Sequence, residues 1–344
     1  MRAAYIERLG EPEVIRCGEL VEPRPGPTDV LVDVEATAVN PVDTFVRSGR
    51  YRTPTPFPFV IGRDLVGRVA EAGPGAPGFA PGDRVWCNSL GHGGRQGAAA
   101  ERAVVPVERL YRLPQDVDPY GAVAAFHPAA TAHLALFAHG GLRSGETVLV
   151  AGGAGNVGAA LTALAAAAGA RVIATAAARD AQHCRALGAT DVVDYRAPDL
   201  AERIAAAAPD GVDLHVDTSG RNDLAEAVAL LAPRGRIVLL AGATSRPVLP
   251  AGELYMKDGS LRGFVISRAT ATELAEAAGD INRLLAAGAL LPRRVETLPL
   301  TAAAEAHRRL EAGEVHGARL VLRTDARPER PKPARFTGRE EQPG

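Results

Sequence analysis

Thr147-Val-Leu-Val-Ala151, followed by Gly152-Gly-Ala-Gly-Asn-Val-Gly158, is the stretch of sequence that decides the fold. The first five residues predict a short buried strand, the next seven a glycine turn, and residues 159–168 a helix. In this context a Gly-x-Gly-x-x-Gly spacing lets the backbone approach a pyrophosphate, whose charge is held by amides and the dipole at the helix N-terminus. The sequence therefore predicts a dinucleotide site. The turn residues expected to contact the cofactor are Gly152, Gly153, Ala154, Gly155, Asn156, Val157 and Gly158.

Composition limits the partners of the chain. At 344 residues it is long enough for two domains, and 39 Lys and Arg against 40 Asp and Glu give a formal net charge of -1. Such a charge provides no field for nucleic acid or an anionic membrane, so we expect small-molecule partners and no binding to nucleic acid or membrane. Three scattered cysteines favour neither a disulfide framework nor a zinc site, and with no signal core or membrane-length apolar run we expect a cytoplasmic protein.

The composition and the pattern of apolar residues change along the chain, and the order of these changes predicts the architecture. Residues 1–121 are rich in β-branched residues, Gly and Pro, with alternating strands such as Val30–Ala36. From 122 to 267, strands and helices alternate, which predicts a doubly wound parallel sheet whose sixth strand is Ser260–Val265. We expect residues 268–324 to rejoin the first domain, so that the cofactor domain is inserted into a split one. Residues 325–344 are charged and Pro-rich, which predicts a disordered tail.

Several motifs resemble the medium-chain dehydrogenase/reductase superfamily. Besides the glycine turn, they are Gly62-Arg-Asp-Leu-Val-Gly67 and Gly82-Asp-Arg-Val85. Asn40-Pro-Val-Asp43 followed by Ser48-Gly-Arg-Tyr51 is similar to the zinc-independent quinone oxidoreductase branch, the ζ-crystallin-like proteins. The resemblance implies a Rossmann domain within a GroES-like β domain, and reduction of a quinone or similar electron-poor α,β-unsaturated carbonyl. An enoyl or alkenal double-bond reductase and a non-catalytic NADPH-binding protein are the alternatives.

The residues at the metal positions of zinc relatives argue against a metal site. Those relatives place a Cys where Asn40 aligns, and a His-Glu pair where Arg63-Asp64 follows Gly62. Zinc needs thiolate, imidazole or carboxylate donors, and a guanidinium has no lone pair to offer. We therefore expect no metal, and we expect Arg63 and Asp64 to pair with each other. Short-chain reductases are excluded because no Tyr has a Lys four residues on.

Three residues are candidates for the chemistry. Related enoyl reductases carry a proton-donating Tyr in a similar stretch, which makes Tyr51 the candidate donor to a developing enolate or quinol oxygen. A half-buried aromatic side chain that anchors a loop is the alternative for Tyr51. We expect Asn40 and Asp43 to line the cleft near the nicotinamide, although Asp43 could equally be a helix cap.

The end of the second strand of the cofactor domain predicts NADPH. Thr175-Ala-Ala-Ala-Arg179 supplies one Arg and no acid, whereas NAD enzymes place a carboxylate there for the ribose diol. Asp180 follows, but as the first residue of a helix it is expected to be a cap that points elsewhere. Tyr195 matches a family Tyr that contacts the adenosine phosphate, and Arg196 could assist.

Further cofactor contacts are expected from segments that border the nicotinamide or cover the cofactor in relatives. They are His127, Thr131, Ser219, Gly242, Lys257, Phe264 and Val265. Of these, Lys257 is expected within a loop formed by residues 255–258. Core or surface packing is the alternative for the histidines at 127, 133 and 139. Cys87 is expected to be a buried hydrophobe. The sixth strand would be an exposed sheet edge, so we expect a homodimer formed by pairing of this strand with its copy.

Overall fold

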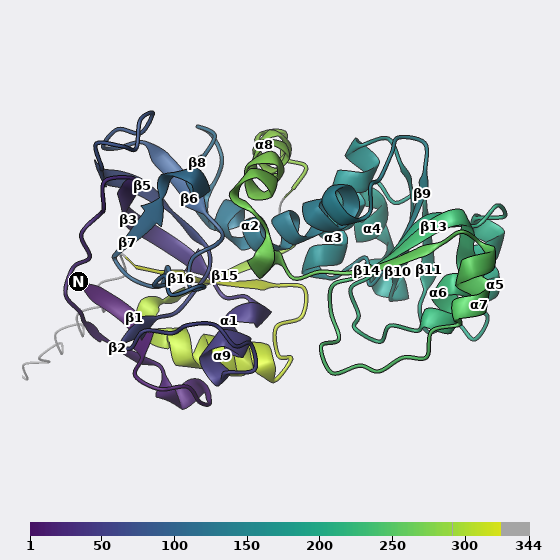
Figure 1. Ribbon diagram of the computed structural model, residues 1–344, viewed down its shortest axis with the longest axis horizontal. Coiled ribbons are helices and arrows are strands. Elements are labelled where there is room, and N and C mark those ends of the chain that lie inside the picture. The colour runs from purple at the N-terminus through teal and green to yellow at the C-terminus, as the bar shows by residue number, and fades with distance from the viewer. Residues whose placement is uncertain (291, 325–344) are drawn as a thin grey trace, which may run out of the picture.

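The computed structural model describes residues 1–290 and 292–324 and contains two sheet-based domains side by side (Figure 1). The cofactor domain is a parallel sheet in the order β11-β10-β9-β12-β13-β14. This is the doubly wound order expected from the sequence, with β9 at the centre and β11 and β14 at the edges. The strands are β9 (Thr147–Ala151), β10 (Arg171–Ala176), β11 (Asp191–Asp194), β12 (Val212–Asp217), β13 (Leu231–Leu239) and β14 (Ser260–Gly263).

Helices cover both faces of this sheet because its strands are apolar on both sides. Val148 and Val150 of β9 share a core with Leu161 of α3, whereas Leu149 between them packs with Ile204 of α5. The period of two along a strand therefore sends alternate residues to opposite helix layers. The helices are α3 (Asn156–Ala167), α4 (Ala181–Ala186), α5 (Leu200–Ala207), α6 (Leu224–Leu230) and α7 (Ala251–Met256).

The β-rich domain is built from both ends of the chain. β16 pairs antiparallel with β3, with Val321 opposite Ala38, so the C-terminal segment rejoins the N-terminal domain as expected. One sheet has the order β15-β16-β3-β5-β6-β8, with β7 also paired to β3, and a second has the order β2-β1-β4. The strands are β1 (Arg2–Ile6), β2 (Arg16–Glu19), β3 (Asp29–Ala38), β4 (Phe59–Val60), β5 (Leu65–Ala72), β6 (Arg84–Cys87), β7 (Arg102–Pro106), β8 (Tyr111–Arg112), β15 (Val295–Pro299) and β16 (Arg319–Arg323).

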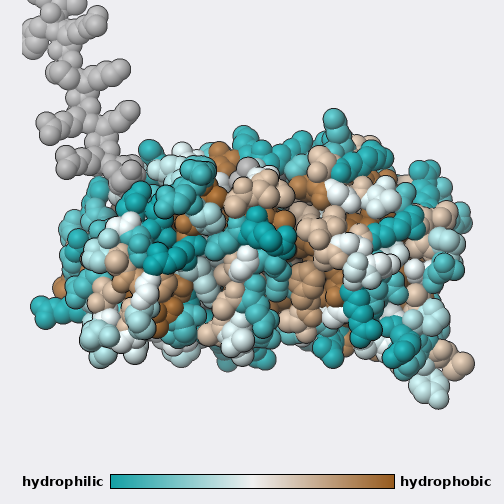
Figure 2. All heavy atoms as spheres, turned by 90° about the horizontal axis from the view of Figure 1, so that it is seen from above, coloured by the Kyte–Doolittle hydropathy of each residue, from teal (hydrophilic) through white to brown (hydrophobic). Residues whose placement is uncertain are grey.

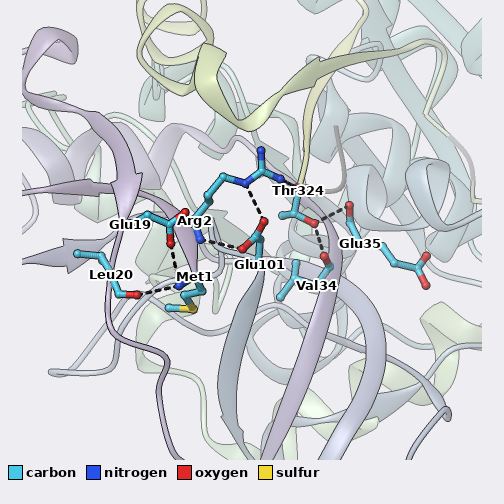
Figure 3. A network of polar contacts seen from close by, with 8 residues as sticks. All are labelled: Met1, Arg2, Glu19, Leu20, Val34, Glu35, Glu101 and Thr324. Atoms are coloured by element: carbon cyan, nitrogen blue, oxygen red, sulfur yellow. Dashed lines mark hydrogen bonds and ion pairs between the residues drawn. The ribbon is translucent and has the colours of Figure 1, made fainter. Parts of the chain in front are cut away.

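A polar network holds the two ends of this domain together (Figure 3). Arg2 Nε lies 2.7 Å from Glu101 Oε1, and Arg2 Nη2 donates to the Thr324 carbonyl at 3.3 Å. The hydroxyl of Thr324 in turn donates to the carbonyl of Val34. Residues more than 280 positions apart thereby become neighbours.

The remaining helices join or flank the two domains. They are α1 (Pro41–Ser48), α2 (Pro119–His133), α8 (Ala271–Ala286) and α9 (Ala303–Glu311), with short turns η1 (Pro12–Val14), η2 (Val107–Arg109), η4 (Ala178–Asp180), η5 (Ile266–Arg268) and η6 (Leu300–Ala302) and the π-helical η3 (Leu134–His139). The continuous helix Pro119–His139 is long and apolar enough to cross a membrane, but 89% of its apolar window is buried inside the fold. It is thus the central core helix, and its Phe126 stacks on Trp86 at 4.0 Å.

Helix α2 lies between the domains (Figure 1), and apolar side chains are visible near the middle of the molecule when it is seen from above (Figure 2). α2 packs against α3 of the cofactor domain and against β3, β5 and β16 of the β-rich domain. Any site formed at the domain junction therefore takes residues from this helix.

One predicted segment differs in the structure, and another predicted segment cannot be compared with it. Residues 255–258 were expected to lie in a loop, but Tyr255 and Met256 end helix α7. The predicted disordered tail, 325–344, lies outside the described residues. Cys87 is fully buried among Val and Leu side chains, which confirms its expected role as a small hydrophobe.

Candidate functional site at the domain junction

The glycine turn has the geometry that a pyrophosphate site requires. Gly152 has φ +84°, and a Cβ on Gly158 would lie 2.1 Å from the Gly152 carbonyl oxygen, so only glycine fits at either position. α3 begins directly after Gly155, and no side chain caps its first amides. These amides are free to hold an anion, and the residues of the turn fit the predicted dinucleotide.

The turn borders a hollow between the domains. Ala154, Gly155 and Asn156 line it together with Ala124 and Pro128 of α2, and Arg293 of the β-rich domain also lies on its wall. Thr175 supports the turn from β10, since its hydroxyl accepts from the Gly152 amide at 3.1 Å. The residues expected to contact the cofactor from the glycine turn, from β10 and from α2 are thus close together.

Arg179 and Tyr195 follow the carboxyl ends of adjacent strands, β10 and β11, which pair with Ala176 opposite Asp194. The side chain of Arg179 is 73% exposed, and the guanidinium of Arg196 lies 5.0 Å over the Tyr195 ring. All three side chains are accessible at the sheet edge where nucleotides bind.

Asp180 points elsewhere, as the sequence predicted, although it makes no capping hydrogen bond. Its carboxylate pairs with Arg293 Nη1 at 2.6 Å and is largely buried. Arg179 Nε lies 3.7 Å from the second oxygen of Asp180, which is too long for a hydrogen bond. The acid nearest this strand end is therefore engaged by a residue of the other domain.

A buried polar cluster surrounds Asn40, the residue that the family resemblance aligns with a zinc ligand. Asn40, fully buried, donates through Nδ2 to Asp64 Oδ2 at 2.9 Å and accepts from Arg319 Nη2 at 2.5 Å. Arg319 also donates through Nε to the Ala124 carbonyl of α2. Both ends of the Asn40 amide are therefore used within the protein, which fixes its orientation.

Asp43 is the reciprocal partner in the capping box of α1. Its carboxylate accepts a hydrogen bond from the backbone N–H of Asn40 at 2.8 Å. This is the helix-cap alternative that the sequence left open. Burial raises the pKa of Asp43 to about 6, against the opposing effects of the Asn40 hydrogen bonds and of Arg63 and Arg319.

Arg63 and Asp64 do not form the expected ion pair. Arg63 Nη2 donates to Ser267 Oγ at 2.8 Å instead, and the carboxylate of Asp64 turns to Asn40. The adjacent side chains diverge because each finds a partner from a different element. Burial raises the pKa of Asp64 well above its usual range and lowers that of Arg63.

His127 of α2 faces the same cluster. Its Nδ1 lies 3.7 Å from Asp64 Oδ1, beyond hydrogen-bond length, and neither atom has another partner among the described residues. Burial, followed by Arg63 and Arg319, lowers the pKa of His127 to about 3, so its imidazole is neutral. The hydroxyl of Thr131, one turn along, donates back to the His127 carbonyl at 2.8 Å.

Tyr51 follows α1 and is half-buried, with its hydroxyl oxygen 3.5 Å from Nε2 of His92. The two rings lie 5.7 Å apart, centre to centre. Our sequence analysis did not single out His92, and Arg319 and Ser267 were also missed. The glycines on both sides of His92 were the one available signal, since they indicate a constrained turn.

Ser219 and Gly242 follow the ends of β12 and β13. The Ser219 amide donates to Asp217 at 2.6 Å, and Gly242 has φ +82° with the amide of Asn222 close by. Phe264 and Val265 follow the end of β14. The ring of Phe264 stacks on His139 at 4.4 Å, and Val265 is exposed.

Lys257 is not brought to this edge. Its ammonium donates to the carbonyls of Ala229 and Leu231 at 2.7 and 2.6 Å, where α6 ends and β13 begins. The start of a parallel strand lies at the opposite edge of the sheet from the carboxyl ends, so the expected nicotinamide contact is wrong for this residue.

The donor set does not fit a metal. Among residues 1–290 and 292–324, no group of three or more His, Cys, Asp or Glu side chains is placed to hold a metal ion. In the cluster, the Asn40 amide is bonded at both ends and the two guanidiniums have no lone pairs, which leaves Asp64 Oδ1 and His127 Nδ1 as two unpartnered donor atoms, fewer than a zinc site needs.

Comparisons with known proteins agree with this geometry. Residues 26–115 match the family model of the alcohol dehydrogenase GroES-like domain, and residues 156–281 match that described as zinc-binding dehydrogenase. The chain is 32% identical to the quinone oxidoreductase of Rattus norvegicus over 310 residues, which cover 89% of this chain and 93% of the relative.

Two solved structures are similar over 94% of this chain and 99% of their own. One, described as an NAD-dependent alcohol dehydrogenase, is 34% identical with a TM-score of 0.83. The other, a mycobacterial protein in complex with NADPH, is 32% identical with a TM-score of 0.78.

The chain therefore belongs to the medium-chain dehydrogenase/reductase superfamily. It is an oxidoreductase of the type that uses a nicotinamide cofactor. Within the superfamily it falls in the quinone oxidoreductase branch.

Proposed function

We propose that this oxidoreductase transfers hydride from NADPH to a quinone, or to a similar electron-poor α,β-unsaturated carbonyl, without a metal ion. The observation that carries the proposal is the buried cluster in which Asn40 is bonded to both Asp64 and Arg319. Carbonyl polarisation is then left to hydrogen-bond donors and fixed charges rather than to a Lewis acid.

The cofactor preference rests on the ends of β10 and β11. The exposed guanidinium of Arg179 and the Tyr195–Arg196 pair can contact a 2′-phosphate, while Asp180 is held by Arg293. A free carboxylate at this place would favour NADH, because it would bind the ribose diol and repel the phosphate.

When bound, NADPH supplies the hydride to the electron-poor carbon of the substrate. The first amides of α3 hold the pyrophosphate, and the turn excludes side chains from the backbone that approaches it. Arg63, which is buried and interacts electrostatically with Tyr51, would stabilise the negative charge that develops on the substrate oxygen. In this proposal the Tyr51 hydroxyl donates to that oxygen.

Reduction of an enoyl or alkenal double bond is the second candidate. The contact between Tyr51 and His92 favours it, because an enone needs a proton as well as a hydride. A quinone anion is stabilised by its own ring and can be protonated by solvent.

One assay separates the candidates: oxidation of NADPH with a quinone, an enone and an enoyl thioester in parallel. We expect turnover with the quinone or the enone. Cofactor binding without turnover on any of the three would instead indicate a non-catalytic NADPH-binding protein.

We also propose a homodimer formed through β14. This strand is an edge of the sheet, and the exposed apolar side chains Val248, Tyr255 and Met256 lie on or next to α7, which leads into it. Pairing β14 with its copy would satisfy its free backbone groups and cover this apolar surface.

A further inference from the structure

His92 is held in a turn that only glycine can form. Gly91, Gly93 and Gly94 have φ of +61°, +63° and +85°, in the left-handed region that other residues rarely adopt. Three left-handed residues in a segment of four reverse the chain sharply and leave His92 as the single side chain at the tip.

Hydrogen bonds fix this turn to the segment that follows Tyr51. The Gly93 amide donates to Thr53 Oγ1 at 2.8 Å, and the Gly94 amide donates to the Pro54 carbonyl at 3.2 Å. Tyr51 is held from the other side, since its amide donates to the Phe45 carbonyl at 2.9 Å. Hydrogen bonds made by the backbone on both sides therefore hold Tyr51 and His92 close together.

The surroundings keep the imidazole of His92 neutral. The pKa of His92 is lowered to about 4, mainly by burial and then by the positive charges of Arg63, Arg95 and Arg109. These three arginines come from different segments. In the described part of the chain, the charged groups that act on His92 are all guanidiniums. A neutral imidazole has one N–H and one lone pair, so it can take a proton on one nitrogen while it gives one from the other.

Both side chains are half-buried, which gives the pair a path to water. Tyr51 packs against the apolar core of the β-rich domain, and the exposed Gly93 and Gly94 follow His92 in the turn. The imidazole therefore lies between the Tyr51 hydroxyl and the exposed end of the turn.

We propose that His92 is a proton-relay residue that acts through Tyr51, returning a proton from solvent to the tyrosine after each reduction of an enone. This inference rests on the proposed function. It assigns Tyr51 a proton source that the family motifs do not provide, and it predicts that enones depend on the pair more than quinones do.

Hydride adds to the β-carbon of the enone, and the Tyr51 O–H bond breaks as its proton passes to the resulting enolate. The Nε2–H bond of His92 then breaks to restore the Tyr51 hydroxyl, and His92 Nδ1 takes a proton from water. Before the next turnover Nδ1 releases its proton to water and Nε2 takes one from water, which restores the starting tautomer. The net consumption is one hydride and one solvent proton per saturated carbonyl formed.

The test compares His92→Phe and His92→Gln with the wild type on an enone and on a quinone. Phe keeps the ring, and Gln keeps a polar group, but neither can pass a proton. We expect the ratio of enone to quinone turnover to fall about tenfold or more in both variants, with the change in kcat rather than KM. Free imidazole in the buffer should restore enone turnover to His92→Ala.

Matched controls separate a relay from a structural role. His316→Gln changes an exposed histidine and should leave both activities as they are. Tyr51→Phe combined with His92→Phe should be no slower on the enone than Tyr51→Phe alone, because the two residues act as one unit. An equal loss on both substrates, or full enone turnover in His92→Gln, would overturn the relay.

A measurement without turnover tests the contact between Tyr51 and His92 separately from the proposed function. In protein labelled with ¹⁵N-histidine, we expect Tyr51→Phe to shift the Nε2 resonance of His92 and to leave that of His316 in place. An unmoved His92 resonance would contradict the contact on which the relay depends. Failure of the proposed function would appear differently, as a wild-type protein that reduces neither substrate.

Discussion

Replacement of Arg179 by alanine should weaken the binding of NADPH and spare that of NADH. A hydrogen bond to a charged group contributes about 1.5–3 kcal/mol net when sheltered. The side chain of Arg179 is 73% exposed, and its Nε lies 3.7 Å from the carboxylate of Asp180, which is bound to Arg293. Screening by solvent lowers the value to about 1–2 kcal/mol, or about five- to thirtyfold in affinity.

The assay measures dissociation constants for both cofactors by titration, and the KM and kcat for NADPH with one quinone. Because the phosphate lies far from the hydride, the contact contributes equally to ground and transition states, so KM should rise and kcat stay constant. Arg185→Ala is the matched control, since Arg185 is also exposed and lies on the next helix, α4. Equal weakening of NADPH and NADH would refute the reasoning and indicate that Arg179 supports the strand-helix turn.

Three further changes test other parts of the structure. Gly158→Ala puts a methyl group 2.1 Å from the Gly152 carbonyl and should weaken both cofactors at least about tenfold by titration, whereas Gly279→Ala, in open space within α8, should preserve binding. A cofactor affinity unchanged in Gly158→Ala would show that the turn does not approach the ligand. Tyr255→Glu alters a side chain that is 80% exposed and should convert the expected dimer to monomer in sedimentation at micromolar concentration; a wild type already monomeric would refute the interface. Stability should fall as the pH drops from 6.5 toward 4, because the unfolded chain binds protons that four imidazoles with pKa values of about 3 to 4 refuse, while two buried carboxyls with raised pKa values oppose the trend. The net difference is roughly two bound protons, or about 3 kcal/mol per pH unit near pH 5, and urea unfolding that showed greater stability at pH 5 than at pH 7 would contradict it. The imidazoles are His92, His127, His215 and His307, and the carboxyls are Asp43 and Asp64.

The cofactor domain could be predicted from the sequence because its signals are local. The strand Thr147–Ala151, the turn after it and the helix that follows are adjacent in sequence, and alternation of strands and helices fixes a parallel sheet. The expected strand end carrying Arg179 and the sixth strand at the edge follow from the same pattern. Local periodicity is enough where neighbours in the fold are neighbours in the chain.

The buried cluster could not be predicted in this way. The partner of Asn40, Arg319, lies 279 residues away, and the partner of Arg63, Ser267, lies 204 residues away. Adjacent charges at 63 and 64 suggested a pair, but long-range partners decided both orientations. His92 meets Tyr51 across 41 residues through a turn whose geometry comes from glycine φ angles.

The error at Lys257 has a local cause. Helix α7 was not recognised because its six residues are too few to show a helical period, so the lysine was assigned to a loop. As the C-cap of α7, Lys257 instead binds carbonyls at the end of α6.

Hydride transfer from NADPH without a metal is tested most directly by quinone-dependent NADPH oxidation. The protein is dialysed against a chelator, and its zinc content is determined on the same sample. We expect full turnover at substoichiometric zinc, because the amide of Asn40 is bonded to Asp64 and Arg319 and offers no free donor to a metal. Turnover that is lost with the chelator and returns in proportion to added zinc would contradict the account.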